Sequence, residues 1–168
     1  MNMTNTAELP VGEQLRRSMR HWVTGVAVVT TVHENVTHGM TVNSFTSVSL
    51  EPPMVTVTMA NNTRTYALVQ QSGVFAITIL TRQQQYLAEL FAGRLPDSGD
   101  RMAGLEVFTL VTGAPLLAGG SAFLDCRVVH AYAMPLSTLY VAEVLAAQSV
   151  PEDLPPLVYH NRVFTGLE

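Results

Sequence analysis

Apolar and polar residues follow the period-two spacing of β-strands over most of the chain. The alternation is clearest between Met54 and Ala60, where apolar residues on one face alternate with threonines on the other. Such strands suit a sheet with one dry face and one wetter face. The strands predicted in this way are Val26–His33, Thr37–Leu50, Met54–Ala60, Val74–Leu80, Val107–Val111, Ser121–Tyr132, Thr138–Gln148 and Leu157–Val163.

Helical spacing is confined to three short segments. Between Glu8 and Trp22, apolar residues recur every three or four positions with arginines between them, which predicts an amphipathic helix. A second helix is expected to begin after Thr63, a suitable N-cap, and to run through Gln70. A third follows a capping box over Thr81–Gln84 and is expected to end at Ala92.

The order of these elements predicts a mainly β fold with peripheral helices. Strands follow one another directly, so the sheet should be mostly antiparallel, and a closed or nearly closed barrel would leave few open edges. The 168 residues suit one domain. We expect residues 1–12 to form an N-terminal tail and helix start, and residues 13–168 to form the domain. The 48% hydrophobic content also favours a large subunit interface.

Charge and composition narrow the classes of partner. The net charge is −4 and there is no basic run, so nucleic acid is not an expected partner. All nine basic residues are arginines, and the absence of lysine excludes a GxxxxGK phosphate loop and a pyridoxal Schiff base. No apolar stretch approaches the roughly 18–20 residues of a membrane span. Without a signal peptide pattern, we expect a cytoplasmic protein that does not enter a membrane.

The common motifs of catalytic and metal sites are missing from the sequence. There is no HExxH, CxxC, GxSxG or GxGxxG, and the five histidines are scattered, so no metal site is expected. The single cysteine, Cys126, is expected to be a buried strand residue. These absences favour a cofactor that brings its own chemistry.

The segment from His38 to Met54 is the most unusual in the chain. If it is a strand, both of its faces mix small hydroxyl side chains with apolar ones. Amide and hydroxyl groups in such a strand can hydrogen-bond to the polar edge of an isoalloxazine ring or to a phosphate. An edge strand whose serines and threonines face water would show the same composition.

Several segments together carry a family resemblance. Thr24–Thr30 reads TGVAVVT and Thr41–Pro53 reads TVNSFTSVSLEPP, with Asn43 at a position where serine is common. Further matching segments, in the same order, are Val74–Leu80, Leu90–Gly93, Asp100–Met102 and Pro156–His160. Over about residues 13–164 the chain resembles the flavin reductase-like, FMN-binding split-barrel family.

This resemblance implies an antiparallel split β-barrel that reduces FMN or FAD with NADH or NADPH and supplies the reduced flavin to a partner flavin-dependent monooxygenase. It also implies a homodimer with the flavin near the subunit boundary. The flavin contacts that it implies form two sets. The first is Thr41, Val42, Asn43, Ser44, Phe45, Thr46 and Ser47, and the second is Ala60, Asn61, Asn62, Thr63 and Arg64.

The second set also has a physical rationale. It spans a helix N-terminus, which offers free N–H groups and the positive end of a dipole to a phosphate, and Arg64 adds a bidentate partner. Arg64 as a solvated side chain, and Asn61 and Thr63 as simple helix caps, remain alternatives. Two more residues are candidates for flavin contacts, Phe91 and Arg101. Phe91 would equally suit the core, and Arg101 would equally suit a surface ion pair.

The chain departs from the family pattern on the nicotinamide side. Members commonly carry Gly-Asp-His before the penultimate long strand, whereas Ser137 occupies the place of that histidine here. Serine can donate one hydrogen bond but cannot carry charge or stack. Tyr159 and His160 are candidates for the missing aromatic contact, unless they are a barrel-wall tyrosine and a surface histidine.

Three other functions remain open at this point. A flavoprotein on the same barrel would hold its flavin tightly and reduce an organic substrate. A non-catalytic barrel would bind flavin without turnover. A barrel unrelated to flavin would carry another ligand.

Overall fold

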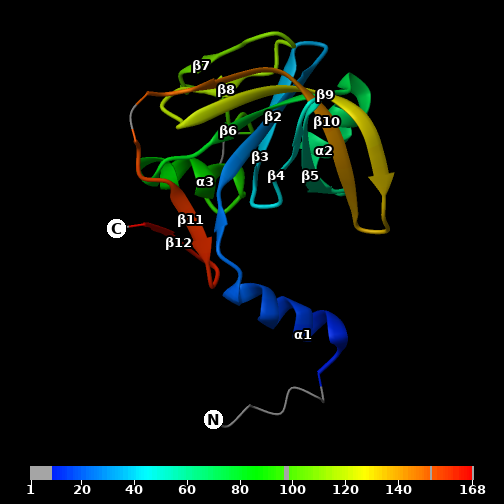
Figure 1. Ribbon diagram of the computed structural model, residues 1–168, viewed down its shortest axis with the longest axis vertical. Helices are drawn as coiled ribbons and strands as arrows, with labels where there is room; N and C mark the ends of the chain where they lie inside the picture. The colour runs from blue at the N-terminus through cyan, green and yellow to red at the C-terminus, as the bar shows by residue number, and fades with distance from the viewer. Residues whose placement is uncertain (1–8, 97–98, 152, 168) are drawn as a thin grey trace.

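A seven-stranded antiparallel sheet forms the body of the protein (Figure 1). The computed structural model describes residues 9–96, 99–151 and 153–167, so the predicted tail and the first residue of the predicted N-terminal helix lie outside it. The strands, in spatial order, are β3 (Val36–Val42), β2 (Ala27–His33), β6 (Val74–Ile79), β9 (Ala122–Ala133), β10 (Ser137–Ser149), β5 (Pro53–Ala60) and β4 (Thr46–Leu50). This arrangement confirms the predicted mainly β, antiparallel fold class.

The sheet curls into a barrel that stays split between its two outer strands. These strands, β3 and β4, follow each other in the chain and are joined by only three residues, Asn43–Phe45. Neighbouring strands lie about 4.8 Å apart, so three residues cannot cross the width of a flat seven-stranded sheet. The two open edges therefore meet at Asn43–Phe45. The prediction of one continuous strand over Thr37–Leu50 was wrong, because the chain leaves the ladder there.

Two helices pack against β2 and β3, and both begin as the sequence predicts. In α2 (Arg64–Ser72), the Thr63 hydroxyl accepts a hydrogen bond from the Tyr66 N–H. The capping box of Thr81 and Gln84 is present, but it opens a 3-10 turn, η2 (Arg82–Gln84), before α3 (Gln85–Phe91).

A small three-stranded sheet lies beside the barrel and corrects another expected strand. It is made of β1 (Thr24–Gly25), β11 (Leu157–His160) and β12 (Val163–Gly166). The expected single strand over Leu157–Val163 was wrong, because the chain turns back at Asn161 and Arg162, whose φ angles are 48° and 67°. Two consecutive positive φ angles are typical of a tight hairpin turn.

The expected strand Val107–Val111 is shorter than predicted. Only β7 (Val107–Phe108) forms, paired with β8 (Leu116–Leu117). The Val111 N–H instead donates to the Asp125 carboxylate at 2.6 Å, and the Thr112 N–H and hydroxyl donate to the same carboxylate. Asp125 is fully buried, and these three bonds give both of its carboxylate oxygens hydrogen-bond donors.

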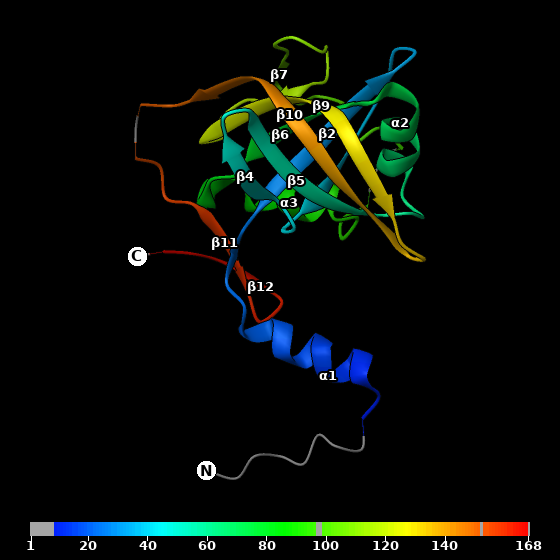
Figure 2. The same cartoon turned by 45° about the vertical axis from the view of Figure 1, so that its right-hand side comes forward.

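The N-terminal helix stands off from the barrel, beside the end of the β11–β12 hairpin (Figures 1 and 2). It consists of α1 (Val11–Ser18) followed by a 3-10 turn, η1 (Met19–His21), so the continuous helix expected up to Trp22 was wrong beyond Ser18. None of its residues is buried. No helix in the described part of the chain is long and apolar enough to cross a membrane.

The barrel interior is packed with alternating residues of its strands. On β5 the apolar residues Val55, Val57 and Met59 are buried, as the alternation predicts. Cys126 on β9 belongs to the same cluster and is fully buried, which confirms the expectation for this residue.

We expect the Cys126 thiol to be unreactive toward a disulfide reagent in the folded protein at about pH 8, because the thiolate is the reactive form. Burial, reinforced by the nearby Asp125 charge, raises the pKa of this thiol from 9.0 to about 12. The unfolded thiol ionises at the lower pH, so the folded state should lose stability as the pH rises from 9.0 towards 12. Modification rates with and without urea test this, and rapid native-state modification would contradict it.

Candidate functional site

Four adjoining cavities follow the split of the barrel. The largest, about 640 Å³, lies between β1, Trp22 and the segment from Val42 to Thr46. A cavity of about 410 Å³ opens at the start of α2, and one of about 160 Å³ shares Thr41 with it. The fourth, about 360 Å³, is lined by Asn43, which also lines the 640 and 160 Å³ cavities. The shared residues make these cavities one groove along the split.

Ser44 keeps the middle of this groove open. Continuing the register of β4 and β5 would place Ser44 opposite Thr58, but no backbone pair forms there. Instead the Ser44 hydroxyl donates to the Thr58 carbonyl at 2.9 Å and accepts from the Thr58 N–H at 3.1 Å. A side chain thus takes the place of a backbone pair, and the backbone N–H and C=O of Ser44 stay out of the ladder, beside the 640 Å³ cavity.

The cavity at the start of α2 has the features of a phosphate site. Arg64 in the first turn and Arg101 from the loop after α3 both line it, as does the N-cap Thr63. Arg101 Nη1 donates to the Phe91 carbonyl at 3.2 Å, which holds its guanidinium at this wall. His38 Nδ1 lies 2.8 Å from the Thr65 hydroxyl on the same side. Two guanidinium groups and a helix N-terminus favour an anionic ligand group.

Tyr159 lines the groove from the small sheet, where it pairs with Thr24 of β1. Arg94 donates to the Tyr159 hydroxyl at 3.4 Å, and its guanidinium carbon lies 4.9 Å from the centre of the Phe164 ring. The Thr41 hydroxyl donates to the Ala88 carbonyl at 2.7 Å, which holds the start of the Thr41–Pro53 segment against α3.

Most of the residues predicted for the site line this groove. They are Thr41, Val42, Asn43, Ser44, Phe45, Thr46, Thr63, Arg64, Phe91, Arg101 and Tyr159. Phe91 also belongs to the core, since only 1% of its surface is exposed. The remaining predicted residues do not line these four cavities, and they are Ser47, Ala60, Asn61, Asn62, Ser137 and His160.

Asn61 and Ser137 lie together at the end of the long β9–β10 hairpin. The Asn61 side chain donates to the Met134 carbonyl at 2.9 Å and accepts from the Thr138 hydroxyl at 2.8 Å. Ser137 pairs with Ala60 in the β5–β10 ladder. Within one chain, the structure therefore places Ser137 and Tyr159 in different parts of the molecule.

Sequence reasoning missed several residues that line the groove, among them Trp22 and four arginines, Arg16, Arg20, Arg94 and Arg162. A signal for the arginines existed in the composition, because a chain without lysine relies on arginine for every cationic contact. The convergence of Arg16, Arg20 and Arg162 depends on the turn at Asn161 and on η1, and neither was predicted. No group of His, Cys, Asp and Glu in the described ranges could hold a metal ion.

The charge of the groove fits a phosphate-bearing ligand. Six arginines line the four cavities, whereas none of the residues lining them is an aspartate or a glutamate. The chain as a whole is acidic, so the positive charge is concentrated at the groove. Unpaired backbone groups at Ser44, hydroxyl side chains and a cationic end are the donor set that a flavin mononucleotide requires.

Comparison with known proteins agrees with this geometry. The model of the flavin reductase like domain matches residues 19–168. An NADH-dependent flavin reductase of a Rhodococcus species is 35% identical over 92% of this chain and 85% of its own length. The reductase subunit of a flavin-dependent monooxygenase of Mycobacterium tuberculosis is 30% identical over 91% of this chain and 81% of its own.

A solved structure extends this agreement to the fold. The styrene monooxygenase flavin reductase of Pseudomonas putida is 32% identical, and it superposes with a TM-score of 0.81 over 92% of this chain and 97% of its own. The chain belongs to the flavin reductase family, and the split-barrel fold predicted from the sequence is confirmed.

Replacing Ser44 by alanine should both destabilise the protein and weaken flavin binding. The change leaves the Thr58 N–H and carbonyl without partners, which costs about 1–3 kcal/mol of unfolding free energy. It also removes the hydroxyl contact that holds the Asn43–Phe45 crossing against Thr58, so the polar backbone groups beside the 640 Å³ cavity lose their fixed position. Urea unfolding and a fluorescence titration with FMN measure the two effects.

Ser149→Ala is the matched control for this experiment. Ser149 is exposed at the end of β10 and lines none of the four cavities, so the control should stay within about 0.5 kcal/mol of the wild type. If both variants bind FMN as the wild type does, Ser44 has no part in the flavin site.

Proposed function

We propose that this protein reduces FMN or FAD with NADH or NADPH and releases the reduced flavin to a partner flavin-dependent monooxygenase. The observation that carries this proposal is the groove at the barrel split, where Ser44 frees the backbone and arginines supply positive charge. Relatives named as NADH-dependent flavin reductase and as the reductase subunit of a flavin-dependent monooxygenase support it. A cytoplasmic setting, in which reduced nicotinamide dinucleotides are maintained, is part of the proposal.

The groove assigns a role to each part of the chain. Arg64, Arg101 and the start of α2 would hold the flavin phosphate, and the Asn43–Thr46 segment would bind the polar edge of the ring. The bound flavin supplies the hydride acceptor. One hydride from the nicotinamide and one proton from water complete the reduction. The protein's task is therefore to position two rings in contact, and no side chain has to act as an acid or base.

Ser137 occupies the position where members of the family commonly carry a histidine on the nicotinamide side of the site. Ser137 starts β10 beside Ala60 and lies outside the four cavities, so within one chain it does not reach Tyr159. Tyr159, with Arg94 against it, lines the groove. We propose that Tyr159 provides the aromatic wall on the nicotinamide side and that Ser137 does not prevent turnover.

We also propose that the protein is a homodimer in which a second copy covers the N-terminal helix. Val11 and Leu15 of α1, Met19 of η1 and the adjoining Trp22 are exposed apolar side chains, and 60% of Leu15 and 65% of Trp22 are exposed. An eight-residue helix is not stable in water without tertiary contacts. The high apolar fraction of the chain agrees with a second copy as the partner.

Purified protein with NADH or NADPH and added FMN or FAD should show flavin-dependent oxidation, followed as loss of absorbance at the nicotinamide band under air. Arg64→Gln should raise the KM for FMN by about tenfold, because a charge-assisted contact to the phosphate is lost. Arg127→Gln is the control, since Arg127 pairs with Glu143 on the exterior and does not line the groove.

The other outcomes of this assay separate the alternatives. Flavin binding without oxidation would indicate a non-catalytic flavin-binding barrel. Yellow protein that keeps its flavin through gel filtration and oxidises NADH only with an organic substrate would indicate a flavoprotein that holds its flavin tightly and reduces that substrate. No binding and no oxidation would overturn the proposal.

Light scattering during gel filtration should give twice the mass of one chain, and Leu15→Asp should shift the protein towards the monomer. The aspartate would place a charge in the apolar face that the second copy covers. Arg17→Asp, on the polar face of the same helix, should stay dimeric. A monomeric wild type would refute this arrangement.

A further inference from the structure

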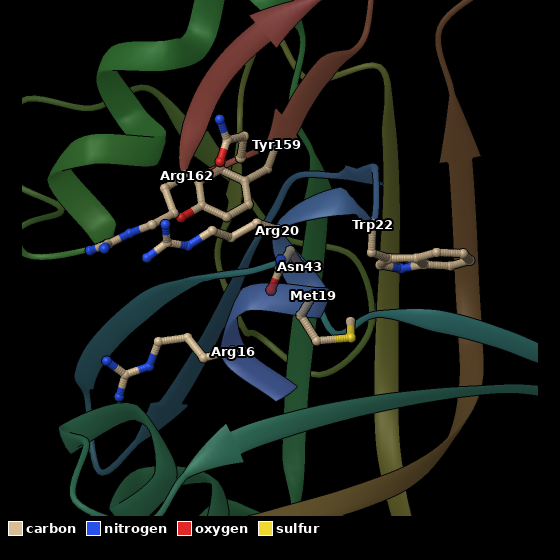
Figure 3. A pocket seen from close by; sticks show the side chains of 8 residues that line it. Arg16, Met19, Arg20, Trp22, Asn43, Tyr159 and Arg162 are labelled. Atoms are coloured by element: carbon tan, nitrogen blue, oxygen red, sulfur yellow. The ribbon is translucent and has the colours of Figure 1, made fainter. Parts of the chain in front are cut away.

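Three arginines converge on one cavity at the end of the groove opposite the α2 phosphate site. Arg16 and Arg20 reach it from α1 and η1, and Arg162 reaches it from the β11–β12 turn. Figure 3 shows the three side chains extending to the same side, those of Arg20 and Arg162 near Tyr159 and that of Arg16 farther from it, whereas the indole of Trp22 extends the other way. The cavity measures about 360 Å³ and shares Asn43 and Tyr159 with the rest of the groove.

The positive charge of this cavity is largely uncompensated. Arg16 lies 3.4 Å from Glu13, whereas neither Arg20 nor Arg162 forms an ion pair within the described part of the chain. Arg20 Nε is buried and has no hydrogen-bond partner. A buried guanidinium N–H without an acceptor is costly, so the site is complete only when an acceptor occupies it.

The arginines are held together by the backbone. The Asn161 N–H donates to the Arg20 carbonyl at 3.0 Å, which ties the hairpin turn to η1. The turn gives Arg162 a φ of 67°, a conformation that favours glycine, yet an arginine stands there. The hairpin and η1 therefore present Arg20 and Arg162 on a common rim.

We propose that Arg16, Arg20 and Arg162 bind the diphosphate of a dinucleotide whose ring lies in the groove. This inference rests on the proposed function and extends it. The proposed function places the phosphate of a flavin mononucleotide at Arg64 and Arg101, so the second, separate arginine set can bind a second anionic group. A diphosphate matches three guanidinium groups, which bind phosphate oxygens bidentately. Its source is the nicotinamide dinucleotide, because the diphosphate of FAD includes the flavin phosphate that the proposed function places at Arg64 and Arg101.

The test uses FMN as the flavin, because FMN has no diphosphate and any effect then belongs to the nicotinamide dinucleotide. Arg20→Gln and Arg162→Gly should each raise the KM for NADH about tenfold or more and leave the Kd for FMN unchanged. Glycine suits the positive φ at residue 162, so the second variant removes the guanidinium without straining the turn. Arg17→Gln is the matched control, since Arg17 lies on the same helix and does not line the cavity.

Titrations of FAD and FMN check this assignment. If the variants raise the KM for NADH and leave the binding of both flavins unchanged, the diphosphate is that of the nicotinamide dinucleotide. If they weaken FAD binding about tenfold and leave the KM for NADH with FMN unchanged, the assignment to the nicotinamide dinucleotide is overturned. The proposal is overturned if both variants match Arg17→Gln in both measurements.

Calorimetry with ADP separates this inference from the function itself. ADP carries the diphosphate without a redox ring, so it should bind the wild type and the Arg17→Gln variant more tightly than Arg20→Gln or Arg162→Gly. If the wild type fails to oxidise NADH but shows this pattern with ADP, the proposed function fails and the arginine site stands. If the wild type oxidises NADH but ADP binding does not depend on Arg20 or Arg162, the proposed function stands and the arginine site is overturned.

Discussion

The hydrogen bonds between the Ser44 hydroxyl and Thr58 determine where this barrel opens. An antiparallel sheet that curls on itself would gain backbone hydrogen bonds by pairing its last edges. Here the chain crosses from β3 to β4 at Asn43–Phe45, and the side chain of Ser44 satisfies the partner that its backbone would have paired with. The ladder can therefore stop without leaving Thr58 unsatisfied, and the polar backbone groups of the split face the groove. The cavities, the hydroxyl groups and the arginines are all arranged along this opening.

Much of this arrangement was predictable from local patterns. The alternation on β5, the N-cap at Thr63 and the capping box at Thr81 are local signals, and each of them is present in the structure. The order of strands and the resemblance to flavin reductases gave the fold class and the greater part of the residues along the groove. Periodicity succeeds here because these elements need only their own neighbours to form.

The errors arise where a distant group competes with the local pattern. The strand expected over Thr37–Leu50 is interrupted because Ser44 bonds to another strand, and the strand expected to reach Val111 ends early because the buried Asp125 takes its N–H. Neither partner is visible in a local window of sequence. The turn at Asn161–Arg162 was missed for a related reason. Hairpin turns with two positive φ angles are usually signalled by glycine, as in Asn-Gly, and here an arginine stands in its place. The arginines of η1 and of this turn were missed because their proximity depends on that hairpin.

The N-terminal helix contributes both to the exposed apolar face proposed for the dimer contact and to the arginine cavity. One face of α1 and η1 is apolar and exposed, while Arg16 and Arg20 of the same segment line the arginine cavity. Within one chain, the backbone bond from Asn161 to Arg20 joins this segment to the β11–β12 hairpin. A second copy that covers the apolar face would restrict the motion of α1 and so lower the entropic cost of ordering Arg16 and Arg20 around an anion. Dimer formation and anion binding would then favour each other, because both stabilise one position of the same helix.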